Sequence, residues 1–121
     1  MNLAVWLERR AEVDPERPAL FHGREQVATY GAFRDGAASG AAWLRAQNVA
    51  PGDRVAIFMA NGPDYLIALW AIWYAGAVAV PINAKLHARE AIYILENAGA
   101  ELVFASGVLA DALQEEGAQV R

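Results

Sequence analysis

The sequence predicts an α/β fold, in which helices pack on a mainly parallel sheet built from βαβαβ units after Arg54. A helix, a short β-hairpin and a second helix are expected to precede these units. The first observation behind this prediction is that short runs of β-type residues alternate with longer runs at helical spacing after Arg54. Such alternation favours parallel strands joined by right-handed crossovers. The second observation is a set of turn residues that divides the earlier part of the chain into three elements.

The chain begins with a predicted helix and a predicted hairpin. Residues 3–13 carry apolar side chains at approximately helical spacing and predict a short amphipathic helix, with Asn2 able to cap its start. Residues 19–22 and 26–28 flank Gly23-Arg24-Glu25, a spacing that suits a short β-hairpin.

A second helix is predicted over residues 30–46, with Thr29 as its cap. Its larger apolar side chains share the segment with alanines and glycines, small residues that permit close packing against a neighbouring element. The helix ends before residues 49–53, where Pro51-Gly52 suits a type II turn because proline fixes φ and glycine supplies a positive φ.

Six alternating elements are predicted after this turn. In chain order, the strands and helices are expected at 55–59, 63–74, 77–80, 89–97, 102–105 and 108–116. Gly99 is expected to end the helix over 89–97. The helix over 63–74 is apolar almost all round, which predicts burial on more than one side. We therefore expect it to lie centrally against the sheet, and part of the apolar surface of the chain to stay open for a neighbour.

An uncharged stretch over residues 65–82 reaches the lower end of the ~18 to 20 residues needed to cross a bilayer. Gly76 at a natural helix end, Pro81 near the close and a change from helical to β-type residues midway argue against a membrane span. The first residues run straight into charged side chains, so a signal peptide is not supported. We expect no transmembrane segment.

The composition excludes several classes of function. The formal net charge is -4 and the basic residues do not cluster, so nucleic acid is not an expected partner. The absence of cysteine excludes disulfides, thiolate metal sites and cysteine nucleophiles, and it is compatible with a reducing compartment, so the cytoplasm is expected. The hydrophobic share of 56% is high for one small domain, which favours a missing neighbour or a homodimer.

The residues offer little catalytic chemistry of their own. Ser39 lies mid-helix without the glycine spacing of a nucleophile elbow, and we interpret it as a small residue at a helix contact. His22 and His87 have no second histidine or carboxylate at a metal-binding spacing, so both are interpreted as surface or capping residues. The two commonest glycine-rich phosphate motifs do not occur. The residues alone therefore predict an α/β domain without a visible active site.

Several short motifs resemble the adenylate-forming superfamily, in the order that this superfamily has them. They are PGDRVAI at 51–57, NGP at 61–63, AIWYAGAVAVPIN at 71–83, Glu90 near the start of a helix, and LVF at 102–104. The chain departs from the family pattern at Ala32, Tyr74 and His87, where a Glu, a Lys and a helix-capping hydroxyl residue are frequent. We expect these departures to weaken local caps and surface charge without changing the family resemblance.

The resemblance implies that residues 1–121 form a single domain, the N-terminal subdomain of a longer AMP-forming acyl-CoA synthetase. Such an enzyme, an acid-thiol ligase, activates a carboxylic acid, here expected to be a fatty acid, with ATP and Mg²⁺ as acyl-AMP and transfers the acyl group to CoA. The family's phosphate loop, its adenine-binding and ribose-binding segments and its C-terminal catalytic Lys lie downstream of Arg121. The chain is therefore expected to carry no catalytic residue, to be inactive alone and to need the remaining subdomains of the parent as partners.

One segment is a candidate for contact with CoA. Asn83, Ala84 and Lys85 follow a predicted strand at the position where acetate-activating relatives place a glycine-containing loop near the CoA nucleotide. The carboxyl ends of strands are also where open α/β sheets usually offer ligand sites. Lys85 would meet a CoA phosphate as a mobile point charge, and Asn83 would use its amide or tighten the turn. The alternative is a solvated lysine and a turn-forming asparagine that need no ligand.

A rival function from another class stays open, which is a stand-alone interaction or assembly domain without catalytic activity. A reading frame that continues into a Thr/Ser-Gly-rich loop with lysine favours the ligase, whereas a natural stop after Arg121 favours the binding module. The acyl-chain length, the choice between CoA and a carrier-protein thiol as acceptor, and the oligomeric state are not readable from these residues.

Overall fold

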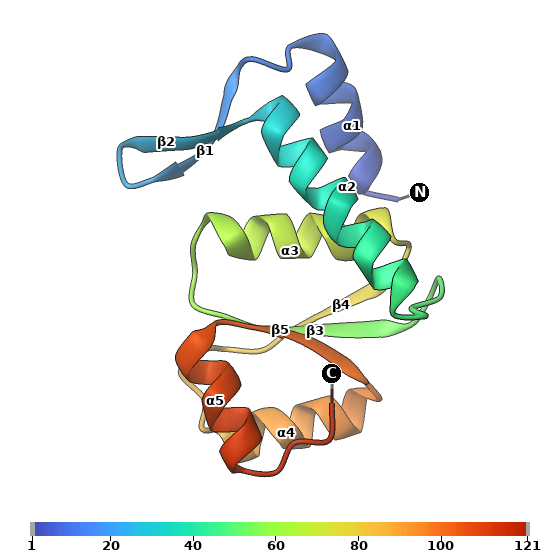
Figure 1. Ribbon diagram of the computed structural model, residues 1–121, viewed down its shortest axis with the longest axis vertical. Coiled ribbons are helices and arrows are strands. Elements are labelled where there is room, and N and C mark those ends of the chain that lie inside the picture. The colour runs from blue at the N-terminus through green and yellow to red at the C-terminus, as the bar shows by residue number, and fades with distance from the viewer. Residues whose placement is uncertain (1, 121) are drawn as a thin grey trace.

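The computed structural model describes residues 2–120 and confirms the predicted order of elements. In chain order they are α1 (Ala4–Val13), β1 (Pro18–His22), β2 (Glu25–Thr29), α2 (Tyr30–Ala46), β3 (Arg54–Phe58), α3 (Pro63–Tyr74), β4 (Val78–Pro81), α4 (Ala88–Ala98), β5 (Leu102–Ala105) and α5 (Gly107–Glu115). Figure 1 shows α3 on one face of the central sheet and α4 and α5 on the other.

The central sheet has three parallel strands in the order β4-β3-β5, and β1 and β2 form a separate antiparallel hairpin. β3 is therefore the middle strand, with Ala56 opposite Val80 on one side and Val103 on the other. This arrangement confirms the predicted α/β fold class with a mainly parallel sheet.

β3 forms the centre of the hydrophobic core because its side chains alternate between the two faces of the sheet. Val55 and Ile57 pack with α2 and α3, whereas Ala56 and Phe58 pack with α4 and α5. All four side chains are at most 1% exposed. The helices on both faces of the sheet thus pack against the same strand, β3.

A third cluster joins the N-terminal elements to α3. Leu7 of α1, Leu20 of β1 and Phe33 of α2 are buried together, and Trp70 of α3 packs against them. The tip of the hairpin projects away from the helices (Figure 1), which leaves Phe21 half exposed.

Close packing of α2 on α3 depends on small residues, as the sequence predicted. A Cβ atom built on Gly40 would lie 2.7 Å from the Cβ atom of Ala71. Ser39, next to it, is exposed in the middle of α2. The expectation that Ser39 sits at the helix contact is therefore wrong, and Gly40 occupies that position instead.

The apolar helix α3 packs against the sheet, as predicted, and α2 covers another side of it, but α3 is only half-buried along much of its length. Ala68, Ala71 and Ile72 are buried, whereas Leu66 is 38% exposed. The helix ends at Tyr74, and Gly76, with a φ of 76°, turns the chain into β4. Among the described residues, no helix has the length and apolar character that a membrane crossing requires.

The predicted turns are observed. Asp53 N–H donates to Ala50 O at 3.0 Å and Gly52 has a φ of 88°, which is the geometry of the predicted type II turn. The hairpin is tighter than predicted, because Glu25 belongs to β2 and pairs with His22, so that Gly23 and Arg24 alone form the loop.

One local expectation is wrong. We expected the histidine at position 87 to weaken the cap of the following helix, but it caps α4 well. His87 Nδ1 accepts a hydrogen bond from Arg89 N–H at 3.1 Å, and Glu90 Oε1 accepts one from His87 N–H at 3.4 Å. A neutral imidazole nitrogen is an acceptor and can replace the hydroxyl oxygen that usually fills this role.

Candidate functional site

A hollow of about 610 Å³ lies at the carboxyl end of the sheet, where the loops after β3 and β4 meet. We call it the carboxyl-end hollow. It is lined by Met59, Ala60, Asn61, Tyr65, Pro81, Ile82, Asn83, Ala84 and Lys85. Because parallel strands end on the same side of a sheet, β3 and β4 bring segments more than 20 residues apart to one place.

All three residues of the predicted CoA-facing segment line this hollow. Asn83 Oδ1 accepts a hydrogen bond from Lys85 N–H at 2.9 Å, and Asn83 O accepts one from Leu86 N–H at 3.1 Å. Asn83 therefore tightens the turn, which was one of the two roles considered for it. Ala84 is half-buried, and Lys85 is exposed.

Lys85 is the single lysine of the chain. Within residues 2–120 its ammonium group forms no ion pair with a carboxylate. It is also the one cationic residue among those that line the carboxyl-end hollow. The hollow thus presents a mobile positive charge that suits a phosphate group, and Met59 and Ile82 contribute apolar surface to its lining.

Sequence reasoning missed three residues at this end of the sheet. Asn61 and Tyr65 line the hollow from the β3–α3 side, and Ser106 Oγ accepts a hydrogen bond from Ala60 N–H at 3.3 Å. The last contact ties the end of β3 to the start of α5, 46 residues away. Asn61 belonged to a recognised motif, which was the one signal that pointed to it.

The described residues do not assemble a metal site or a nucleophile with its base. Across residues 2–120, no group of three or more His, Asp or Glu side chains is placed to hold a metal ion. His22 is exposed at the end of β1, and His87 is engaged in the cap of α4. The chemistry that the carboxyl-end hollow can offer is therefore binding and positioning of a ligand.

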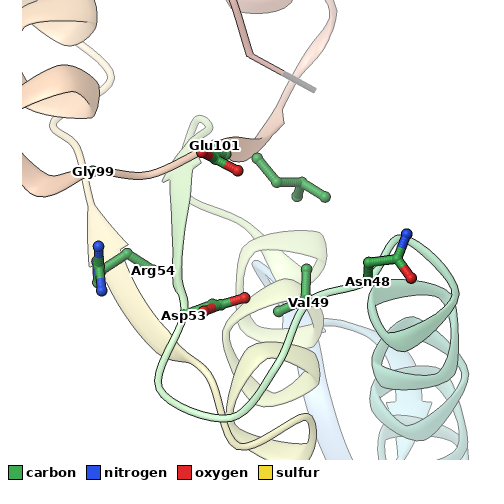
Figure 2. A pocket seen from close by; sticks show the side chains of 7 residues that line it. Asn48, Val49, Asp53, Arg54, Gly99 and Glu101 are labelled. Carbon is green, nitrogen blue, oxygen red and sulfur yellow. The ribbon is translucent and has the colours of Figure 1, made fainter.

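A second hollow, of about 180 Å³, lies at the amino end of the sheet and is shown in Figure 2. It is lined by Asn48, Val49, Asp53, Arg54, Gly99, Glu101 and Leu102. Two of its charged groups are engaged with the backbone. Asp53 Oδ2 accepts from Ala50 N–H at 2.8 Å, and Arg54 Nε donates to Ala98 O at 2.9 Å, at the C-terminus of α4. These contacts stabilise the fold and leave little for a ligand.

Tyr74, a departure from the family pattern, also acts at the amino end of the sheet. Its hydroxyl group donates a hydrogen bond to Glu8 Oε2 at 2.7 Å and so joins α3 to α1. Arg34 of α2 lies 3.7 Å from the other carboxylate oxygen of Glu8. Burial raises the pKa of Tyr74, and the hydrogen bond to Glu8 raises it further.

Over most of its length the chain is similar to curated proteins that are named as CoA ligases or CoA synthases. Feruloyl-CoA synthase of Amycolatopsis sp is 41% identical over 102 residues, which are 84% of this chain and 21% of the relative. The chain therefore spans about a fifth of the length of such relatives.

Two solved structures have the same fold. The N-terminal domain of FACL13 from Mycobacterium tuberculosis matches 98% of this chain and 31% of its own length, with a TM-score of 0.85 and 33% identity. A benzoate CoA ligase from Burkholderia xenovorans LB400 matches 100% of this chain and 25% of its own length, with a TM-score of 0.90 and 28% identity. The family model described as AMP-binding enzyme matches residues 7–121, and the chain therefore belongs to the AMP-binding enzyme family.

Proposed function

We propose that the chain is the N-terminal subdomain of an ATP-dependent acyl-CoA ligase, which activates a carboxylic acid as acyl-AMP and transfers the acyl group to CoA. The observation that carries this proposal is the family match over residues 7–121, in a chain that spans about a fifth of the relatives. In the intact parent, ATP with Mg²⁺ supplies the adenylyl group, and CoA supplies the accepting thiol.

The role that we assign to this chain is to hold part of CoA at the carboxyl-end hollow. We propose that Lys85, which lines the hollow, meets a phosphate group of the CoA nucleotide, and that Asn83 holds the turn that presents Lys85. The free ammonium group and the preformed turn support this role. No catalytic residue is assigned to residues 2–120.

The chain by itself is proposed to be inactive in adenylation. Stabilising the charge that develops on phosphoryl oxygens requires several cations or backbone donors aimed at them. The carboxyl-end hollow offers Lys85 as its one lining cation. The remaining donors must therefore come from the other subdomains of the parent.

We define the substrate as a carboxylic acid. A fatty acid agrees with the resemblance seen in the sequence, whereas the names of two relatives specify feruloyl and benzoate groups. A chimera tests whether the chain works as this subdomain of a carboxylate-activating ligase. In it, residues 2–120 replace the aligned segment of the benzoate CoA ligase, and carboxylate-dependent exchange of labelled pyrophosphate into ATP is measured with benzoate, ferulate and a long-chain fatty acid.

The chimera is expected to catalyse exchange and to form a thioester with CoA. Exchange lost in a chimera that is folded would contradict the proposed function. Lys85→Ala is expected to raise the KM for CoA about 1.4- to fivefold, as expected for an exposed ionic contact of roughly 0.2–1 kcal/mol, and to leave the exchange rate unchanged. Lys85→Arg, which keeps the charge, serves as the control. An unchanged CoA dependence in Lys85→Ala would remove Lys85 from the site.

A further inference from the structure

The turn that presents Lys85 is anchored at both of its ends. Ile82 N–H donates to Ile57 O of β3 at 2.9 Å, which fixes the end of the turn that leaves the sheet. The other end enters α4 at His87, whose carbonyl oxygen accepts a hydrogen bond from Glu90 N–H at 2.9 Å. Lys85 therefore lies between an anchor on the sheet and an anchor on the helix. The place of its ammonium group depends on both.

The anchor on the helix is a histidine side chain. His87 is exposed, whereas its neighbours Leu86 and Ala88 pack in the core cluster that α4 forms with α5. His87 Nδ1 accepts a hydrogen bond from Arg89 N–H at 3.1 Å. Arg89 N–H is one of the first N–H groups of α4, which have no partner within the helix. The imidazole thus satisfies a backbone donor from a position that water reaches.

This hydrogen bond forms in one protonation state of the imidazole. The neutral ring has one nitrogen that accepts, whereas both nitrogens of the imidazolium ion are donors. Protonation of Nδ1 therefore sets two N–H groups against each other and removes the cap. The positive end of the helix dipole also disfavours a cation at this place. Since histidine ordinarily changes charge between pH 5 and 8, the cap is sensitive to pH in that range.

The charged groups around His87 act in both directions. Lys85 and Arg89 flank it along the chain and disfavour a further positive charge. Glu90 Oε1 accepts a hydrogen bond from His87 N–H at 3.4 Å, so one nearby carboxylate favours the imidazolium ion. The guanidinium group of Arg89 lies 3.5 Å from the carboxylate of Glu116, at the end of α5.

The elements packed against α4 give the imidazole no further charged partner within residues 2–120. β4 and β5 carry uncharged side chains alone, and Arg54 of β3 donates to Ala98 O at the opposite end of α4. On α5, Asp111 and Glu115 are exposed and form no hydrogen bond or ion pair in the described part of the chain. The cap therefore depends on the charge of the imidazole itself.

We propose that His87 is a positioning residue for the Lys85 turn, and that it holds this turn only as the neutral imidazole. With the neutral ring, the cap fixes the start of α4 and with it the turn from Asn83 to Lys85. With the imidazolium ion, the first turn of α4 frays and the Lys85 turn loses its second anchor. Capture of CoA then weakens as the pH falls. This proposal rests on the proposed function, because it takes a CoA phosphate as the group that Lys85 meets.

Amide hydrogen exchange of the 121-residue chain tests the cap without any ligand. Ala91 N–H donates to His87 O at 3.1 Å in the first turn of α4, so its protection reports whether that turn is formed. Relative to the intrinsic rate at each pH, protection of Ala91 is expected to fall about fivefold between pH 7.5 and pH 5.5, as for the loss of one N-cap. Equal protection at the two pH values would overturn the proposal.

The amide signals of the turn provide a second readout on the same chain. Lys85 N–H donates to Asn83 Oδ1, and Leu86 N–H donates to Asn83 O. Both signals are expected to shift over the pH range in which Ala91 loses protection. If they stayed constant while Ala91 lost its protection, the cap would not hold the turn, and the positioning role of His87 would be wrong.

Matched variants separate the cap from the rest of the molecule. His87→Ser keeps an acceptor that does not change charge in this range, so protection of Ala91 should be high at both pH values. His87→Ala removes the acceptor, and protection should be low at both. His22→Ser removes the other histidine of the chain, which is exposed at the end of β1, and should keep the original pH dependence. A fall of the same size in His87→Ser would overturn the proposal, because its cause would lie elsewhere.

The KM for CoA in the benzoate CoA ligase chimera tests the link to Lys85. The phosphate of CoA also changes charge in this range, so we compare the chimera with its His87→Ser variant at each pH, which cancels that change. The ratio of the two KM values is expected to be near one at pH 8 and about two at pH 5.5, within the effect expected for Lys85→Ala. In a Lys85→Ala background the ratio should be one at both pH values, because His87 acts through Lys85.

The possible results distinguish this proposal from the proposed function. A ratio below one at pH 5.5 would overturn the positioning role, because the imidazolium ion would then attract the phosphate itself. An active chimera with a ratio of one at pH 5.5 would also remove that role and leave the function standing. A folded chimera that forms no thioester would remove the proposed function, while Ala91 and the turn signals of the chain alone still decide whether His87 holds the turn.

Discussion

The two ends of the central sheet differ in what their polar groups do. At the amino end, Asp53, Arg54 and Tyr74 each hold a specific partner on another segment of the chain. At the carboxyl end, Lys85 is exposed and unpaired among residues 2–120, and Asn83 bonds only within its own turn. Both ends are hollowed, but of the two hollows only the one at the carboxyl end keeps a positive charge free for a phosphate group, whereas the unpaired charge at the amino end is the carboxylate of Glu101.

This difference shows that a hollow lined by charges is not in itself a binding site. Asp53 and Arg54 of the amino-end hollow satisfy backbone groups that would otherwise stay unpaired, whereas the larger carboxyl-end hollow is bordered by loops. Substitutions at the amino end should therefore lower stability, and substitutions at the carboxyl end should change ligand binding with little effect on stability.

The largest effect is expected from Gly99→Ala at the amino end. Gly99 has a φ of 69°, and a Cβ atom there would lie 2.8 Å from a terminal guanidinium nitrogen of Arg54. We expect a loss of roughly 2 to 3 kcal/mol, from a strained backbone and a displaced Arg54. Gly52→Ala, with a φ of 88° and open space around it, isolates the backbone contribution of about 1 to 2 kcal/mol. If urea unfolding gave the same loss of stability for Gly99→Ala and Gly52→Ala, the displacement of Arg54 would contribute nothing to the loss in Gly99→Ala.

Tyr74→Phe is expected to lower stability by about 1 to 2 kcal/mol at pH 8, because it removes the hydrogen bond to Glu8. The effect should depend on pH. The pKa of Tyr74 is raised in the folded protein, so the contribution of Tyr74 is full below the ordinary tyrosine pKa of about 10 and is lost as the pH rises above it. Urea unfolding at pH 8 and pH 11 should show the two proteins converging. A constant difference would exclude the assigned role.

Asp53→Ala is expected to cost about 0.5 to 1.5 kcal/mol, because Ala50 N–H loses its acceptor. Glu101 lines the same hollow, and the structure gives its carboxylate no hydrogen bond or ion pair within residues 2–120. Glu101→Ala should therefore change stability by less than about 0.5 kcal/mol. If both variants lost the same stability, the hydrogen bond would not be the reason that Asp53 matters.

The smallest effect on stability is expected from Lys85→Ala at the carboxyl end. The ammonium group has no partner in the described part of the chain, so the free energy of unfolding should stay within about 0.5 kcal/mol of the original value. Thermal unfolding of the 121-residue chain gives the comparison. A loss above 1 kcal/mol would mean that Lys85 is a structural residue like Arg54, and the contrast between the two ends of the sheet would disappear.

The parts of the fold that depend on local chemistry were predictable from the sequence. Pro51-Gly52 and Gly99 need backbone angles that few other residues adopt, and both ended elements where expected. The alternation after Arg54 predicted a parallel sheet. The segment 83–85 could be placed at the carboxyl end of the sheet because it follows a strand directly.

The parts that depend on distant contacts were not predictable in this way. The strand order β4-β3-β5 arises from packing on both faces of the sheet, which periodicity does not report. Tyr74 meets Glu8 across 66 residues, and Ser106 meets the backbone of Ala60 across 46. The effectiveness of the cap at His87 was underestimated because propensity favours hydroxyl and carboxylate side chains there, although an imidazole nitrogen can accept the same bond.

The most direct test of whether adenylation requires residues outside this subdomain uses the purified 121-residue chain. It measures the exchange of labelled pyrophosphate into ATP. With benzoate, ferulate or a long-chain fatty acid present, we predict no exchange above a protein-free control, while the benzoate CoA ligase chimera carrying residues 2–120 exchanges under the same conditions. Carboxylate-dependent exchange by the chain alone, which persists through repeated purification, would contradict the assignment of adenylation to the remaining subdomains.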